Sequence, residues 1–252
     1  MEREDSDERR RYESKLYDIG FACGKMAEDI SRLFSLDKIL VVVPLRGGLP
    51  ISKGVVYGLD KIARASETFE TSPIPETDVV YVPASSIVKD RNEVIENLVS
   101  DRINRMYGER GYKAIVVLDE AISGSSSNMV FSAVKNSVKN CKEDKNWKRF
   151  YWKELPIHLF IVSAYNGYKL EPSIQKLSNV LIYPIEGNII TTDNSKIYPL
   201  EYWNVVGRRT STKNGKEYNV VEPDILFFNN EKWDKTVEGI EKGVDGYFKQ
   251  KT

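Results

Sequence analysis

An α/β fold with a doubly wound parallel sheet is the fold class that the sequence predicts. Short runs of apolar, mostly β-branched residues recur along the chain, and continuous apolar runs are typical of strands buried on both faces of a parallel sheet. Stretches with apolar residues at helical spacing separate these runs, and strands that alternate with helices build parallel sheets. The predicted strands are Ile39–Val43, Asp78–Val82, Ile115–Leu118, Ile157–Val162 and Val180–Tyr183.

The predicted helices are located by apolar residues three or four positions apart. One helix covers residues 12–34, with its apolar stripe at Leu16, Ile19, Cys23, Met26, Ile30 and Leu33. A second helix has Pro50 in its first turn and runs to about Tyr57. A third carries a stripe at Val130, Val134 and Val138. The residues up to about Arg11 are nearly all charged, and we expect them to be solvated and disordered.

The pattern changes after about Ile185. Two segments, Tyr202–Arg209 and Glu217–Val221, flank Lys213-Asn214-Gly215, and Asn-Gly favours a tight hairpin turn. We expect this region to form a small β hood. A C-terminal helix follows, although three glycines inside it disfavour a helix. Its apolar face is Trp233, Val237, Ile240, Val244 and Phe248, and the glycines are Gly239, Gly243 and Gly246.

The size of the chain suits one α/β domain. The chain has 252 residues, enough for one large core. We therefore predict a single domain over residues 1–252, with a core at about 35–184, a hood at about 185–225, and flanking helices at about 12–34 and 231–248.

Charge and cysteine content limit the kinds of partner and the cellular setting that we expect. Basic and acidic residues balance at 37 each, so no net charge attracts nucleic acid or an anionic membrane. Cys23 and Cys141 form neither a metal-binding spacing nor a disulfide framework. We expect a cytoplasmic protein with small-molecule partners, no membrane segment and no nucleic-acid partner.

A loop of small residues follows the strand predicted at Ile115–Leu118 and leads into a helix. Backbone N–H groups at a helix N-terminus have no intrahelical acceptor, and the helix dipole adds partial positive charge there. Such a loop is suited to hold a phosphate, and serine hydroxyls add further donors. The loop residues are Ser123, Gly124, Ser125, Ser126 and Ser127.

Two acids, Asp119 and Glu120, stand directly before this loop. Acids repel an anion, so their position beside a phosphate site calls for a second kind of partner. Carboxylates accept hydrogen bonds from vicinal hydroxyls, and ribose 5-phosphate carries both a phosphate and such a diol. One alternative stays open, in which the serines cap an ordinary helix and the acids favour its dipole.

Several other motifs do not fit the chain. A nucleophile elbow needs G-x-S-x-G, but Gly124 is followed by Ser126 and Asn128. A P-loop needs Gly-Lys-Ser/Thr, which is missing. The single histidine, His158, lies in an apolar strand run, so we expect a structural role. The basic and aromatic segment Trp147–Lys153 suits either single-stranded nucleic acid or a surface loop anchored by its rings.

Two segments together resemble a known family. Leu118–Ser127 resembles the binding motif for 5-phosphoribosyl pyrophosphate (PRPP) in type I phosphoribosyltransferases, where apolar strand residues precede two acids, two apolar residues and a loop of Thr, Gly and Ser. Val43–Leu49, which contains Pro44-Leu45-Arg46-Gly47-Gly48, resembles the family's pyrophosphate loop and is most similar to the version in uracil phosphoribosyltransferases. The order of the two motifs also fits, and the resemblance covers roughly residues 39–183.

This resemblance implies a phosphoribosyltransferase-like, Rossmann-type fold and a function. The enzyme would transfer the 5-phosphoribosyl group from PRPP to a nucleobase and release pyrophosphate. Mg²⁺ would arrive with PRPP, without a direct protein ligand. We expect the protein to form a homodimer.

The resemblance also assigns roles to residues. Asp119, Glu120 and Arg46 would form the catalytic centre, with the two acids on the ribose hydroxyls. The 5-phosphate would contact Ser123, Gly124, Ser125, Ser126 and Ser127, and pyrophosphate would contact Leu45, Arg46 and Gly47. The base would lie at Tyr183, Ile185 and Trp203. The family's flap would correspond to Ala84–Gly111. Its Lys89, Arg91, Arg102 and Arg105 could reach pyrophosphate, or each could lie on a solvated helix face.

Two rival hypotheses stay open. The chain has serine at Ser125 and Ser126, where the family usually has glycine, and serine is strained wherever φ must be positive. This departure motivates a non-catalytic protein of the same fold that binds PRPP or a nucleotide as a regulator, with nucleic-acid contact. The other rival is a Rossmann-like enzyme such as a methyltransferase, for which Gly47-Gly48 would approach the cofactor.

Overall fold

The computed structural model describes most of the chain. The described residues are 2–35, 37–45, 47–65, 74–84, 90–105, 111–121, 124–143, 155–164, 172–175, 179–185, 206–213, 216–223 and 231–251. Within these ranges, no helix combines the length and the apolar character that crossing a membrane requires.

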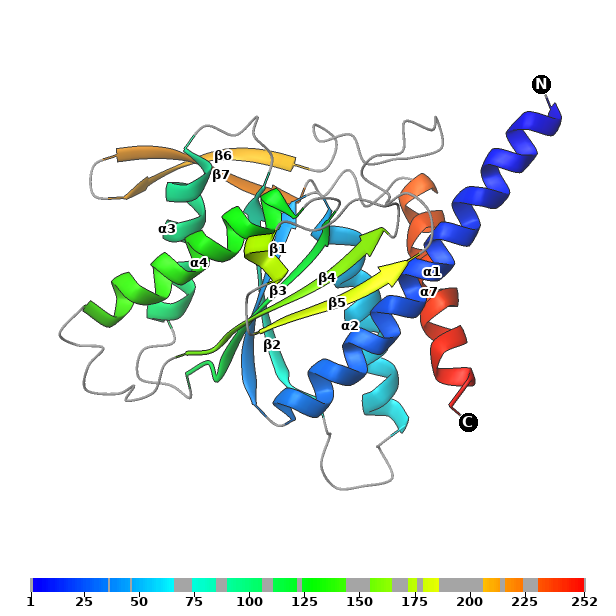
Figure 1. Ribbon diagram of the computed structural model, residues 1–252. Helices are drawn as coiled ribbons and strands as arrows, with labels where there is room; N and C mark the ends of the chain where they lie inside the picture. The colour runs from blue at the N-terminus through cyan, green and yellow to red at the C-terminus, as the bar shows by residue number, and fades with distance from the viewer. Residues whose placement is uncertain are drawn as a thin grey trace.

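A five-stranded parallel sheet forms the centre of the molecule (Figure 1). Its strands lie in the order β2-β1-β3-β4-β5, and every neighbouring pair is parallel. This arrangement confirms the predicted fold class. The strands are β1 Lys38–Leu45, β2 Glu76–Pro83, β3 Ala114–Ala121, β4 Ile157–Ala164 and β5 Val180–Ile185.

Helices cover both faces of the sheet, as a doubly wound fold requires (Figure 1). On one face lie α1 Glu2–Phe34 and α2 Gly48–Ala65, with α7 Glu231–Lys249 packed against both of them. On the other face lie α3 Arg91–Arg105 and α4 Ser125–Glu143. A short helix, α5 Pro172–Gln175, precedes β5.

Each central strand contributes to two cores because successive side chains point to opposite faces. In β3, Val116 and Leu118 belong to the core under α1 and α2. Ile115 and Val117 belong to the core under α3 and α4. The continuous apolar runs of the sequence therefore reflect burial on both sides.

The glycines of the C-terminal helix have a steric cause. A Cβ atom on Gly243 would lie 2.0 Å from the carbonyl oxygen of Tyr17, and one on Gly20 would lie 1.9 Å from the carbonyl oxygen of Ile240. α1 and α7 therefore touch backbone to backbone. The concern that these glycines disfavour a helix is overturned, because the close packing requires them and offsets their low helix propensity.

The N-terminal prediction is corrected. α1 begins at Glu2, well before the predicted start near residue 12, so the backbone of the charged segment is helical and not disordered. Its first turn contains Glu2, Glu4 and Asp5, and the helix dipole favours negative charge there.

The hood hairpin is confirmed as secondary structure. β6 Val206–Lys213 pairs with β7 Lys216–Pro223 in antiparallel register, and Lys213 stands opposite Lys216, with Asn214 and Gly215 between them in the sequence. β7 lies against β2 and α3. The part of the predicted first strand that precedes Val206, with Tyr202 and Trp203, lies outside the described residues.

The segment predicted as a flap contains a core helix. Ile95, Val99 and Ile103 of α3 are buried against the sheet, so this part of Ala84–Gly111 is not a free cover. Arg91 donates to the carbonyl of Ala84, and Arg102 lies 3.5 Å from a carboxylate oxygen of Asp78. These two arginines hold α3 in place. Lys89 and the side chain of Arg105 lie outside the described parts.

Replacing Gly243 by alanine tests the backbone contact between α1 and α7. The new Cβ would meet the Tyr17 carbonyl and Gly20. This clash outweighs the ~1 kcal/mol that alanine gains in helix propensity, and we expect the free energy of unfolding in urea to fall by about 1–3 kcal/mol. Lys242→Ala, at the adjacent exposed position, should leave the unfolding midpoint unchanged. Equal effects of the two changes would contradict the packing.

Candidate functional site

The sheet order indicates where a candidate ligand site lies. The chain runs from β1 outward to β2 and then returns to β3 on the other side of β1. Ligands of open α/β sheets bind where the order reverses, outside the carboxyl ends of the strands. The two segments singled out in the sequence follow β1 and β3, which are the two strands at this switch point.

The turn after β1 lies against the end of β3. A Cβ atom on Gly48, the first residue of α2, would lie 2.5 Å from the carbonyl oxygen of Leu118, so only glycine fits there. A Cβ on Gly47 would lie 3.4 Å from Oδ1 of Asp119 and 3.5 Å from Cβ of Glu120. The two motifs, distant in sequence, are therefore in contact.

The predicted pyrophosphate loop is shorter than the sequence indicated. β1 continues through Pro44 to Leu45, which is buried and whose carbonyl accepts from the backbone N–H of Ala84, so the side chain of Leu45 does not line the loop. Gly47 is the turn residue, and α2 begins at once with Gly48. Arg46 lies outside the described residues.

The two acids belong to β3 itself and not to the loop after it. Asp119 pairs with Ile161 in the core under α3 and α4, while Glu120 pairs with Val162 in the core under α1 and α2. Both side chains are buried, with exposed fractions of 3% and 6%. Because strand residues alternate, the two carboxylates leave the strand on opposite faces.

Asp119 is held by two hydrogen bonds. Its Oδ2 accepts from the hydroxyl of Ser127 at 2.5 Å, and its Oδ1 accepts from the backbone N–H of Glu120 at 2.9 Å. Burial raises the pKa of Asp119 to about 7, and the two hydrogen bonds oppose that rise by favouring the ionised form. A carboxyl group of this kind gains or loses a proton near neutral pH.

Glu120 faces the α1 side of the sheet. Its charge lies near the thiol of Cys23, which is wholly buried in α1 and donates to the carbonyl of Ile51. Burial, with the charge of Glu120 as a smaller cause, raises the pKa of Cys23 far above its usual value. Cys23 is therefore a neutral core thiol and not a nucleophile.

The start of α4 has the geometry of a glycine-capped helix N-terminus. Gly124 has a φ of 83°, and its carbonyl accepts the first helical hydrogen bond, from Asn128 N–H at 2.8 Å. Ser125 and Ser126 lie inside the helix and are exposed, while Ser127 is buried. In this loop the described residue with positive φ is the glycine, so the serines that follow it are not strained. Ser123 lies outside the described residues.

The predicted base-binding residues lie further along the sheet. Tyr183 and Ile185 of β5 face α1, and with α1 they line a pocket of about 500 Å³, a volume common for small-molecule sites. The ring of Tyr183 stacks on Phe160, with 6.2 Å between ring centroids. Its role in base binding stays a prediction, and Trp203 lies outside the described residues.

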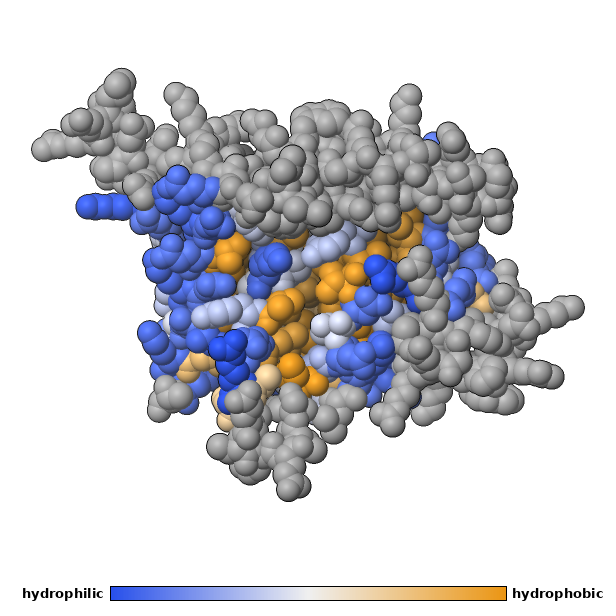
Figure 2. All heavy atoms as spheres, turned by 180° about the vertical axis from the view of Figure 1, so that it is seen from behind, coloured by the Kyte–Doolittle hydropathy of each residue, from blue (hydrophilic) through white to orange (hydrophobic). Residues whose placement is uncertain are grey.

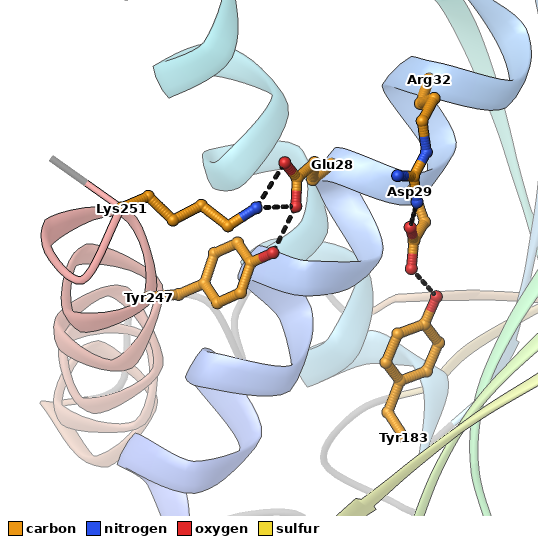
Figure 3. A network of polar contacts seen from close by, with 6 residues as sticks. All are labelled: Glu28, Asp29, Arg32, Tyr183, Tyr247 and Lys251. Atoms are coloured by element: carbon orange, nitrogen blue, oxygen red, sulfur yellow. Dashed lines mark hydrogen bonds and ion pairs between the residues drawn. The ribbon is translucent and has the colours of Figure 1, made fainter.

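A polar network holds the hydroxyl of Tyr183 (Figure 3). Its hydroxyl donates to Asp29 of α1 at 2.9 Å, and Arg32 pairs with the same carboxylate. Glu28, on the next position of α1, accepts from Tyr247 and Lys251 at the C-terminal end (Figure 3). Sequence reasoning missed Asp29, because 154 residues separate it from Tyr183.

Three further features are less suited to bind a ligand or to take part in catalysis. Figure 2 shows apolar side chains between hydrophilic ones on the opposite side of the molecule. An apolar pocket between α2 and strands β1 and β2 has a volume of only about 70 Å³, which is small for a ligand. His158 packs edge-to-face on Phe34, and burial lowers its pKa, in keeping with a structural role.

The described ranges contain no cluster of three or more His, Cys, Asp or Glu side chains that would hold a metal ion.

Comparison with known proteins gives only a weak likeness. No protein-family model and no curated protein matches the sequence. A solved hypoxanthine phosphoribosyltransferase from Staphylococcus aureus is 12% identical with a TM-score of 0.39, over 69% of this chain and 76% of that chain. HGPRT-ase from Leishmania tarentolae, solved with GMP, is 11% identical with a TM-score of 0.37, over 69% and 79%. A likeness this weak carries no argument about function.

Replacing Asp119 by asparagine tests the buried carboxyl group. An aspartate in the unfolded chain titrates near pH 3.9, whereas burial raises the pKa of Asp119 to about 7 in the folded protein. Between these values the folded state binds the extra proton, so wild-type stability falls as pH rises from about 4 to about 7, by up to ~1.4 kcal/mol per pH unit. Asp119→Asn lacks this decline.

Urea unfolding between pH 5 and pH 8 measures this difference. The stability of Asp119→Asn relative to wild type should rise up to about pH 7 and then level off. Asp234→Asn, at an exposed position of α7, controls for exchanging a carboxylate for an amide. A difference between Asp119→Asn and wild type that stays constant over this range would contradict the burial of the charge.

Proposed function

We propose that this protein transfers the 5-phosphoribosyl group from PRPP to a nucleobase and releases pyrophosphate. One observation carries the proposal: Gly47 lies against Asp119 and Glu120 at the switch point, directly beside the glycine-capped start of α4. An anion cradle and a pair of acids thus share one edge of the sheet. A ligand with a phosphate and a sugar diol matches both groups.

Different residues would contact different parts of the ligand. The N–H groups of the first turn of α4 and the exposed Ser125 and Ser126 would hold the 5-phosphate. Asp119 would accept a ribose hydroxyl, and Glu120 would accept the other where β3 ends. The backbone at Leu45 and Gly47, with the predicted Arg46, would face pyrophosphate.

The chemistry needs no covalent nucleophile. Positive charge develops at the anomeric carbon as pyrophosphate leaves, so catalysis would come from positioning and from nearby negative charge. Asp119 would supply that charge at or above neutral pH, because burial raises its pKa to about 7. Activity that rises with pH through this range agrees with the proposal.

Mg²⁺ is the proposed cofactor. Hard oxygen ligands of pyrophosphate, ribose and water suit this ion, and PRPP supplies them. The protein part of the described site offers the two acids near the sugar and no three-ligand cluster. Tyr183 and Ile185 remain the proposed contacts of the base, and a homodimer the proposed assembly.

Labelled PRPP tests the proposed reaction. The protein would be incubated with ³²P-labelled PRPP, Mg²⁺ and a panel of purine and pyrimidine bases, and the products would be separated as nucleotide and pyrophosphate. Nucleotide formed with one class of base supports the transferase. PRPP binding by calorimetry without nucleotide from any base would reject transfer and favour a non-catalytic PRPP- or nucleotide-binding regulator. A protein that binds neither PRPP nor ribose 5-phosphate would overturn both.

Placing a negative charge in the proposed phosphate cradle should weaken phosphate binding. Ser126→Asp brings a carboxylate to the exposed first turn of α4, where it repels the 5-phosphate and occupies the same donors. We expect the affinity for ribose 5-phosphate, measured by calorimetry, to fall at least tenfold. Ser132→Asp is the matched control, because Ser132 is an exposed serine further along the same helix. An equal loss in both variants would argue against this cradle.

A further inference from the structure

The serines at the start of α4 are not equivalent. Ser125 and Ser126 are exposed, whereas Ser127 has an exposed fraction of 1%. Helical side chains tilt back toward the N-terminus, so the third residue of α4 reaches over the first turn toward the sheet. Its hydroxyl meets the end of β3 and not the outer surface of the cradle.

The hydroxyl of Ser127 is committed to the acid. It donates to Oδ2 of Asp119 at 2.5 Å, while the backbone N–H of Glu120 donates to Oδ1 at 2.9 Å. Both oxygens are thereby fixed, so the carboxylate has one orientation. Each oxygen keeps a further lone pair, which a ligand hydroxyl can use. A hydroxyl that donates its single proton to Asp119 cannot also donate to a phosphate.

Among the described residues, the neighbours of Asp119 offer few other donors. The first turn of α4 has no lysine or arginine, Gly47 on the α2 side has no side chain, and β4 contributes Ile161. Glu120 is the neighbouring carboxylate and faces Cys23 of α1 on the other side of the sheet. Ser127 is therefore the side chain that orients Asp119 within the described structure.

We propose that Ser127 is a positioning residue, whose hydroxyl orients Asp119 toward a ligand hydroxyl while the exposed serines of the same turn contact the phosphate. The identity of the ligand in this role rests on the proposed function, whereas the hydrogen bonds that orient Asp119 do not. The resemblance assigned Ser127 to the 5-phosphate. In the new assignment, one hydrogen bond both holds the start of α4 to β3 and orients the carboxylate of Asp119.

Three variants separate the two roles. Ser127→Ala removes the hydroxyl, Ser127→Thr keeps it, and Ser126→Ala removes an exposed hydroxyl of the same turn. Binding of inorganic phosphate and of ribose 5-phosphate would be measured by calorimetry for each. We expect Ser127→Ala to weaken ribose 5-phosphate about tenfold and to leave inorganic phosphate unchanged. Ser126→Ala should weaken both ligands by the same factor, and Ser127→Thr should restore ribose 5-phosphate binding.

A second readout needs no ligand. The side-chain carboxyl ¹³C shift of Asp119, followed against pH by NMR, reports its titration in the folded protein. Loss of the Ser127 hydrogen bond should raise the pKa of Asp119, because that bond favours the ionised form. Ser127→Thr should titrate like wild type, and Ser132→Ala, at an exposed position of α4, should change neither readout.

The outcomes distinguish the two proposals. Equal loss of inorganic phosphate and ribose 5-phosphate in Ser127→Ala would make Ser127 a phosphate ligand and overturn the positioning role. An unchanged titration of Asp119 in Ser127→Ala would overturn it as well. If wild-type protein binds no ribose 5-phosphate, the proposed function fails, while the titration of Asp119 still decides whether Ser127 positions it.

Discussion

The contact between Gly48 and the backbone of Leu118 is the constraint on which the site depends. A side chain at Gly48 would stand 2.5 Å from the Leu118 carbonyl oxygen. Because glycine has no side chain, the first turn of α2 lies directly on the last residues of β3. Gly47 is thereby brought to Asp119 and Glu120, and the ends of β1 and β3 become one surface. Without this approach, a side chain would separate the ends of these two strands at the switch point.

Burying a carboxylate costs it the free energy of hydration. Hydrogen bonds within the fold offset part of this cost at Asp119. Asp119 loses its hydration at the end of a strand, and the Ser127 hydroxyl and the Glu120 amide replace part of it. The balance leaves its pKa near 7. A group tuned in this way is typical of functional sites, because a fully stabilising arrangement would have been apolar.

The helices on the side of the sheet away from α4 are closely packed. α1, α2 and α7 pack closely through glycines, with a Cβ on Gly54 only 2.7 Å from the Cβ of Cys23 and one on Gly58 only 2.6 Å from that of Ala27. Asp29 of α1 reaches across to Tyr183 of β5. This close packing supports one face of the sheet, and the candidate site lies where β1 and β3 end.

The sequence by itself determined the fold class, the five strands and the two loops that meet at the switch point, because apolar periodicity and glycine punctuation are local properties of the chain. Tertiary structure decided what depends on distant segments. It extended β3 through Asp119 and Glu120, turned those acids to opposite faces, and committed Ser127 to Asp119. It also explains the glycines of α7, since backbone and side-chain atoms of α1 occupy the space where their side chains would be. No local pattern encodes such contacts, because each depends on which surfaces the folded chain brings together.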